Sequence, residues 1–137
     1  MSESPDIKKA RAVVIDDDDG FRILLSRILE EIGHEVYTIA NVSPGSVSVI
    51  KPSDIVFLDM RMPGLSGFDV IRLLAKDRVE CSLILMSGNP NDITEAEGLA
   101  HQLGVELLGV LDKPIRMADV LAILEEKPRH LSATGRS

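Results

Sequence analysis

The chain has 137 residues, a length that suits one domain, and its 45% hydrophobic and 27% charged residues are typical of a globular protein. A net charge of −7 and only 3% aromatic residues argue against direct binding to nucleic acid, which needs a basic surface and often stacking rings. The single cysteine, Cys81, excludes an internal disulfide and fits a cytoplasmic location. No run approaches the roughly 18 apolar residues of a membrane span, so we expect no membrane binding.

Five short runs rich in Val, Ile and Leu recur along the chain and predict buried strands. The runs are AVVI (12–15), VYTIA (36–40), IVFL (55–58), LILM (83–86) and LLGVL (107–111). Between them, apolar residues at helical spacing predict helices over 21–32, 68–75, 92–103 and 117–126. Gly33 is expected to end the first of these, and segment 43–51 to form a short or frayed helix. We expect polar, loose tails at 1–9 and 128–137 around one domain at 10–127.

The alternation of strands and helices predicts an α/β fold with a doubly wound parallel sheet and helices on both faces. Right-handed crossovers leave few topologies for five such units. In folds of this kind, ligands bind outside the carboxyl ends of the strands, where the strand order reverses. The residues that directly follow each apolar run are therefore the candidates for a functional site.

Polar residues follow four of these runs: Asp16 to Asp19, then Asp59, then Ser87, and finally Asp112 and Lys113. In the strand order 2-1-3-4-5, the first and third strands are neighbours, which brings Asp16, Asp17 and Asp59 into one pocket. Three carboxylates repel one another unless a divalent cation neutralises them, and Mg²⁺ suits such oxygen ligands. With the Ser87 hydroxyl and the Lys113 ammonium, these groups suit the transfer of a phosphoryl group to a carboxylate.

Four segments carry a resemblance to a known family: VVIDDDDGFR, IVFLDMRMPGLSG, LILMSG and LDKP, in this order. Over about 11–126 the chain resembles the receiver domain of response regulators in two-component signalling. The resemblance implies a flavodoxin-like (βα)5 fold with a five-stranded parallel sheet in the order 2-1-3-4-5. It implies that Asp59 is the phosphoacceptor and that Asp16 and Asp17 help to hold Mg²⁺.

The resemblance also implies roles for three further residues. The backbone carbonyl of Arg61 would be another metal ligand, Ser87 the switch hydroxyl, and Lys113 the phosphate-binding ammonium. The peptide bond between Lys113 and Pro114 is expected to be cis, as is typical of receivers.

The function implied is a phosphorylation-dependent signalling switch that is no enzyme beyond catalysing its own phosphorylation and dephosphorylation at Asp59. The donor would be a sensor histidine kinase or a histidine phosphotransfer protein, and the target a downstream protein or a missing output domain. Whether the domain stands alone or belongs to a longer regulator stays open.

Two positions depart from the family pattern. Val110 stands where an aromatic is frequent, so no aromatic can report phosphorylation there, and Gly88 replaces the usual Ala, which leaves room for water or small phosphodonors.

Simpler interpretations apply to several polar residues taken singly. Asp18 and Asp19 are expected to serve the start of the first helix, where carboxylates accept backbone N–H groups. Alone, Asp59 could be a solvated turn residue, Ser87 a loop cap and Lys113 a surface charge. Solvated charges are expected at three arginines, packing roles at four methionines and a buried structural role at the cysteine: Arg61, Arg72, Arg78, Met60, Met62, Met86, Met117 and Cys81.

Two other functions compete with the switch. The run from Asp17 to Gly20 resembles the nucleophile motif of haloacid-dehalogenase-type phosphatases, with Asp17 as nucleophile. That family needs a further acidic motif after the lysine, whereas only 24 residues follow Lys113, and it leaves Asp59 unexplained. The second alternative is an interaction module with the receiver fold that works without phosphorylation, suggested by Val110 and Gly88.

Overall fold

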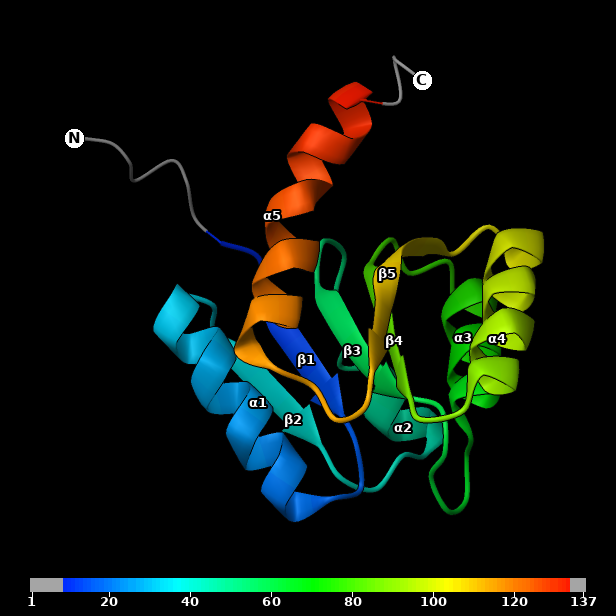
Figure 1. The fold of residues 1–137 in the computed structure, drawn as a ribbon. Coiled ribbons are helices and arrows are strands. Elements are labelled where there is room, and N and C mark those ends of the chain that lie inside the picture. Colours follow the sequence, from blue (N-terminus) through cyan, green and yellow to red (C-terminus); the bar gives the residue numbers. More distant parts are fainter. Residues whose placement is uncertain (1–8, 134–137) are drawn as a thin grey trace.

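The computed structural model describes residues 9–133 and contains one five-stranded, all-parallel sheet in the order β2-β1-β3-β4-β5 (Figure 1). The strands are β1 (Ala12–Ile15), β2 (Val36–Ile39), β3 (Ile55–Asp59), β4 (Ser82–Ser87) and β5 (Glu106–Asp112). The helices are α1 (Asp19–Ile32), α2 (Pro44–Val47), α3 (Gly67–Lys76), α4 (Pro90–Leu103) and α5 (Met117–Ala133). The predicted fold class and strand order are confirmed.

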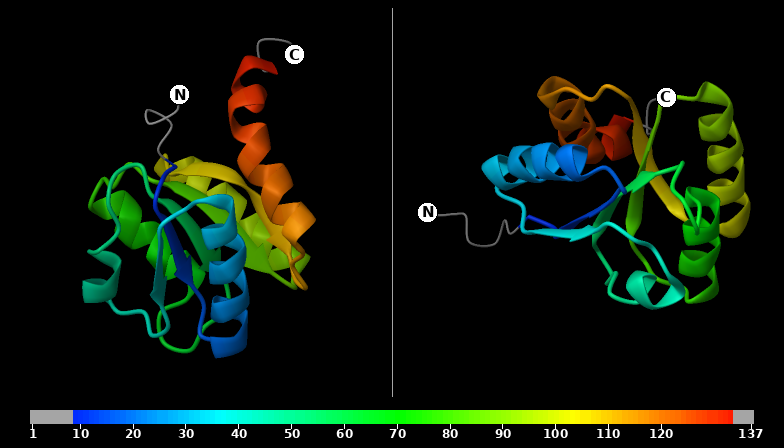
Figure 2. Two further views of the ribbon diagram at one scale, coloured as in Figure 1. Left: turned by 90° about the vertical axis from the view of Figure 1, so that its left-hand side faces the viewer. Right: turned by 90° about the horizontal axis from the view of Figure 1, so that it is seen from below.

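The helices form two layers, α1 and α5 on one face of the sheet and α2, α3 and α4 on the other (Figure 2). Side chains of a strand alternate between its faces, so each central strand contributes to two cores. Val13 and Val56 pack with α2, α3 and α4, whereas Val14 and Phe57 pack with α1 and α5. All four are fully buried, which explains why the central strands are continuous apolar runs.

The prediction of uniformly buried strands is wrong at the edges of the sheet. In β2, Tyr37 is 43% exposed and Thr38 is also exposed, and most of β5 is only half-buried. Both strands lie at an edge, where a strand has one neighbour and less cover from the helices. The Tyr37 ring instead packs against the guanidinium of Arg11, 5.4 Å from the ring centroid.

The helix ends follow local sequence signals. Asp18 is the N-cap of α1, and its carboxylate accepts a hydrogen bond from the Phe21 amide at 3.0 Å. Gly33 ends α1 in the left-handed conformation, with φ of 111°. Both predictions are confirmed, as is the short helix within 43–51, which is the four-residue α2.

Helix α5 ends at Ala133, later than the predicted end at residue 126, and projects past the sheet (Figure 1). The predicted end rested on the apolar pattern, and a helix can continue beyond the residues that carry such a pattern. Residues 1–8 and 134–137 of the predicted tails lie outside the described residues, and the domain boundaries stay predictions. Among the helices described, none is long and apolar enough to cross a membrane.

A buried ion pair joins the beginnings of β1 and β3, at the end of the sheet opposite the carboxyl ends of the strands. The Arg11 guanidinium donates to both oxygens of Asp54, at 3.2 Å from Nε and 2.7 Å from Nη2. The Lys51 amide also donates to this carboxylate at 2.8 Å. Asp54 is only 3% exposed, so its charge depends on these donors.

Replacing Asp54 with Ala removes the partner of the Arg11 guanidinium, and we expect the free energy of unfolding to fall by about 3 kcal/mol. Asp19→Ala is the matched control, because Asp19 pairs with Arg22 but is 83% exposed, and its loss should be below about 1 kcal/mol. Urea unfolding followed by circular dichroism measures both variants. Equal losses in the two would contradict the importance of the buried pair.

Candidate functional site

Three carboxylates converge at the carboxyl ends of β1 and β3. Asp16 and Asp17 directly follow β1, and Asp59 is the last residue of β3. One oxygen of each lies within 4.8 Å of the others. Because β1 and β3 are neighbours in the sheet, the cluster predicted from the sequence is brought together. Asp16 and Asp59 are buried, while Asp17 is exposed.

Backbone amides of the following loops orient the two buried carboxylates. Asp16 Oδ1 accepts from the Asp18 amide at 2.9 Å, and Asp59 Oδ1 accepts from the Arg61 amide at 3.3 Å. The Arg22 guanidinium donates to the Asp16 carbonyl at 2.8 Å and also pairs with Asp19. The start of α1 is therefore tied to the acidic cluster, and Asp18 and Asp19 serve the helix as predicted.

Lys113 supplies the positive charge of the site. Its Nζ lies 2.8 Å from Asp16 Oδ2 and 3.5 Å from Asp59 Oδ1, and 4.6 Å from the centroid of the Phe21 ring. The bond to Pro114 is cis, as the resemblance implied. Burial alone would lower the pKa of Lys113, but its hydrogen bond to Asp16 and the charge of Asp59 raise it above the ordinary value. Lys113 is therefore a fixed cation at neutral pH.

One ammonium does not neutralise three carboxylates. Burial, and then the charge of Asp16, raise the pKa of Asp59 from 3.8 to about 6, although Lys113 acts in the opposite direction. Raised carboxyl pKa values are typical of sites that bind a cation or perform chemistry. The residues present fit a hard divalent cation, because the donor set consists of clustered carboxylate oxygens with excess negative charge.

Ser87 ends β4 beside the cluster and is buried. Its hydroxyl accepts from the Asn89 amide at 2.9 Å and donates to the Asn89 carbonyl at 3.4 Å, so it also caps its loop. A cavity of about 490 Å³ brings it together with the acids and the lysine: its lining comprises Asp16, Asp17, Asp18, Asp59, Arg61, Ser87, Gly88, Asn89 and Lys113. A Cβ at Gly88 would meet no atom within 4 Å, so its absence leaves this wall open.

Sequence reasoning missed three features of the site. Asn89 caps α4 through its side chain, and the order Asn89-Pro90 is the signal that could have found it, since proline favours the first helical position. Phe21 was predicted only as the first of the apolar residues of the helix over 21–32, yet its ring lies against Lys113. Arg61 was expected to be a solvated charge. Its side chain is 67% exposed but pairs with Asp92 of α4.

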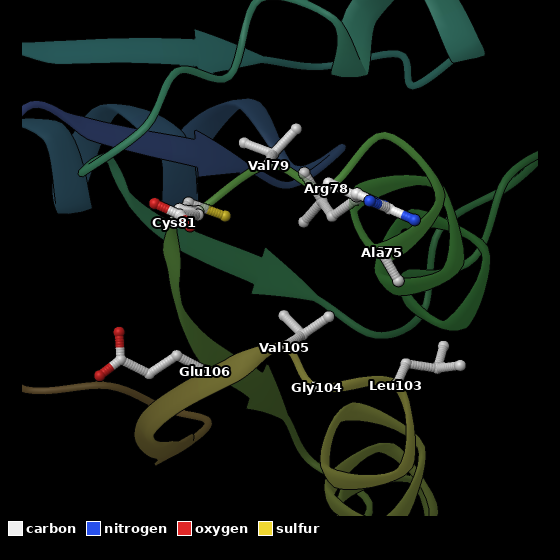
Figure 3. Close-up of a pocket in the computed structure, with 10 residues that line it drawn as sticks. Ala75, Arg78, Val79, Cys81, Leu103, Gly104, Val105 and Glu106 are labelled. Atoms are coloured by element: carbon white, nitrogen blue, oxygen red, sulfur yellow. The ribbon is translucent and has the colours of Figure 1, made fainter.

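A second pocket, of about 500 Å³, lies at the opposite end of the sheet, where β4 and β5 begin (Figure 3). Cys81 lies there between α3 and β4 and is 4% exposed. Burial, and then the charge of Asp54, raise the pKa of its thiol to about 11. The thiol is protonated at neutral pH, which agrees with the structural role expected for Cys81.

Fold and site together define a receiver-type domain, with acids, a hydroxyl and an ammonium at the carboxyl ends of a doubly wound sheet. Residues 12–125 match the family model of the response regulator receiver domain. The chain belongs to this family of two-component signalling proteins.

Relatives and solved structures agree with the assignment. The chain is 31% identical over 117 residues to the acid tolerance regulatory protein ActR of Rhizobium meliloti. This match covers 85% of this chain and 58% of ActR. The chain is also 31% identical over 117 residues to the DNA-binding transcriptional regulator NtrC of Azospirillum brasilense, and the match covers 24% of NtrC. A response regulator from Colwellia psychrerythraea superposes with a TM-score of 0.74 and 31% identity, covering 88% of this chain and 98% of that one. This chain thus spans less than two thirds of these two curated relatives.

Without divalent cations, Asp59→Asn is expected to stabilise the folded protein near pH 7 by about 3 kcal/mol, since it removes a charge that burial disfavours. The pKa of Asp59 is higher in the folded state, so the folded protein binds more protons than the unfolded chain between 3.8 and about 6. Wild-type stability should therefore fall as pH rises through this window, and the advantage of the variant should grow.

Urea unfolding in EDTA across this pH range measures the difference. Asp112→Asn is the control, because Asp112 is an exposed acid at the same end of the sheet, where the strands finish. A difference between wild type and Asp59→Asn that does not change with pH would contradict the raised pKa.

The Cys81 thiol of the folded protein is expected to react with a disulfide reagent about 100-fold more slowly than that of the urea-unfolded chain, because little thiolate forms. Absorbance of the released thiol product measures both rates. Similar rates would show that Cys81 is accessible and ionised.

Proposed function

We propose that this chain is a phosphorylation switch that accepts a phosphoryl group on Asp59, with Mg²⁺ held by Asp16, Asp17, Asp59 and the Arg61 backbone carbonyl. The observation that carries the proposal is the cluster itself: three carboxylate oxygens within 4.8 Å, with Lys113 close to two of the acids. The same cavity is lined by these carboxylates, the Ser87 hydroxyl and the Lys113 ammonium.

Mg²⁺ is the cation that suits this set, because it is hard, takes carboxylate oxygens and keeps some of its waters. When bound, it would neutralise charge on the acids and on the phosphoryl oxygens. TrrA of Thermotoga maritima, whose structure was solved in complex with Mg²⁺-BeF, shares the fold with a TM-score of 0.68 and 23% identity, covering 85% of this chain and 97% of TrrA. That complex supports the choice of cation.

The residues of this chain then have distinct tasks. A carboxylate oxygen of Asp59 attacks the phosphorus, an acyl phosphate bond forms, and the bond between phosphorus and the donor nitrogen breaks. The Lys113 ammonium, already 3.5 Å from Asp59, pairs with the phosphoryl oxygens. The Ser87 hydroxyl donates a hydrogen bond to the same group once it turns from the Asn89 carbonyl.

The donor is proposed to be a sensor histidine kinase or a histidine phosphotransfer protein in the cytoplasm, and the target a downstream protein or an output domain. Such partners agree with the family. NtrC is a DNA-binding regulator, but the net charge of −7 on this chain favours a role without direct contact to nucleic acid. The biological effect of the whole protein is then set by the downstream protein or output domain that receives the signal.

An interaction module that works without phosphorylation is the second candidate, favoured by the half-buried Val110 in place of an aromatic. The phosphatase alternative has little support. Asp18 caps α1, and Asp19, at the second acidic position of the proposed motif, is 83% exposed and paired with Arg22. The second acid of the motif, Asp19, is therefore not among the residues that line the cavity.

Wild-type protein incubated with acetyl phosphate and Mg²⁺ is expected to gain one phosphoryl group, detected by intact-protein mass spectrometry. Asp59→Asn should gain none, because its amide is a poor nucleophile, and EDTA should abolish uptake by the wild type. The control Asp112→Asn should behave as the wild type. Full uptake by Asp59→Asn would refute the site, and no uptake by any protein would favour the interaction module.

A further inference from the structure

The side chain of Arg61 joins the acidic cavity to helix α4. Its Nε lies 2.6 Å from Asp92 Oδ2 and its Nη2 lies 3.4 Å from Asp92 Oδ1, so one side of the guanidinium faces both oxygens of the carboxylate. Asp92 is in the first turn of α4 and its side chain is only 14% exposed. The pair spans 31 residues of sequence and connects the β3–α3 loop with α4.

Arg61 is also held beside the phosphoacceptor. Its backbone amide donates to Asp59 Oδ1 at 3.3 Å, which fixes the start of its side chain at the site. Arg61 lines the cavity that contains Asp59, Ser87 and Lys113, and it also lines a neighbouring one that contains Asp92. Arg61 therefore lies on the border between the two cavities, with its backbone at Asp59 and its guanidinium at Asp92.

The energetics favour an exchange of partners. The Arg61 side chain is 67% exposed, so its ion pair with Asp92 stabilises the first turn of α4 only modestly and can yield to a more strongly charged partner. A phosphoryl group brings nearly two negative charges and three acceptor oxygens, which suit the guanidinium fork better than one carboxylate does. Asp92 is not left without support, because a carboxylate in the first turn of a helix is stabilised by the helix dipole.

We propose that Arg61 is a phosphoryl-binding residue whose guanidinium is paired with Asp92 before phosphorylation. When the guanidinium moves to the phosphoryl group of Asp59, the first turn of α4 loses this ion pair and is released. This inference rests on the proposed phosphorylation of Asp59. It gives the signal a route to α4 that needs no aromatic at the position of Val110. The second contact of the site with this turn, from Ser87 to the N-cap Asn89, lies beside the first and would change in the same event.

Two variants that break the same ion pair are expected to change phosphoryl uptake in opposite directions. Asp92→Asn frees the guanidinium for the incoming phosphoryl group, so the rate of uptake from acetyl phosphate should rise about fivefold, the effect of one charge at contact distance in a water-like medium. Arg61→Gln removes the guanidinium, so the rate should fall by about the same factor. The double variant should match Arg61→Gln, because Asp92 acts only through Arg61.

Glu97→Gln is the matched control, since Glu97 is an exposed acid of α4 and its loss changes the net charge equally. Intact-protein mass spectrometry measures the rates, and hydrogen exchange of the α4 first-turn amides measures the release. In the wild type, phosphorylation should speed this exchange, while in Arg61→Gln it should change it little.

Parallel changes of uptake in the two single variants, or independent effects in the double variant, would overturn the inference while leaving phosphorylation of Asp59 intact. Uptake that Glu97→Gln raises as much as Asp92→Asn would do the same, because it would reduce the effect to net charge. No uptake by the wild type would overturn both the inference and the proposed function.

Discussion

The crowding of like charge at the carboxyl ends of β1 and β3 is the constraint on which the rest of the site depends. Asp16 and Asp59 are buried beside each other, Asp17 is next to them, and Lys113 is the ammonium that contacts the two buried acids. Such a cluster lowers the stability of the folded protein unless cations neutralise it. The raised pKa of Asp59 is a consequence of this burial and repulsion. The parallel sheet sustains it because the central strands are buried on both faces and hold the acids in place.

The sequence predicted the features that depend on local pattern. Apolar runs located all five strands, since the central ones are covered by helices on both faces, and helical spacing located the helices. Asp18 and Gly33 were predicted at helix ends because capping needs only a short side chain or a left-handed residue at a fixed offset. The acidic cluster followed from strand order: parallel strands end at one edge, so Asp16, Asp17 and Asp59 had to meet once β1 and β3 were neighbours.

Features that depend on side-chain partners far apart in sequence could not be predicted in this way. The pair of Arg61 with Asp92 spans 31 residues and that of Arg11 with Asp54 spans 43, and no periodicity marks either. The exposure of Tyr37 in β2 depends on which strand lies at the edge, which an apolar run does not show. In each case the tertiary arrangement decides, and it makes Arg61 a link between the site and α4 instead of a solvated charge.

The central claim, that the acidic cluster needs a divalent cation, is tested most directly by the stability of the protein as a function of Mg²⁺ concentration. A ligand that binds only the folded state raises the free energy of unfolding continuously as its concentration exceeds the dissociation constant. We expect Mg²⁺ to raise the thermal unfolding temperature of the wild type in this way, and Asp17→Asn to lose most of the effect. A wild type whose unfolding temperature does not respond to Mg²⁺, or a variant that responds equally, would contradict the account.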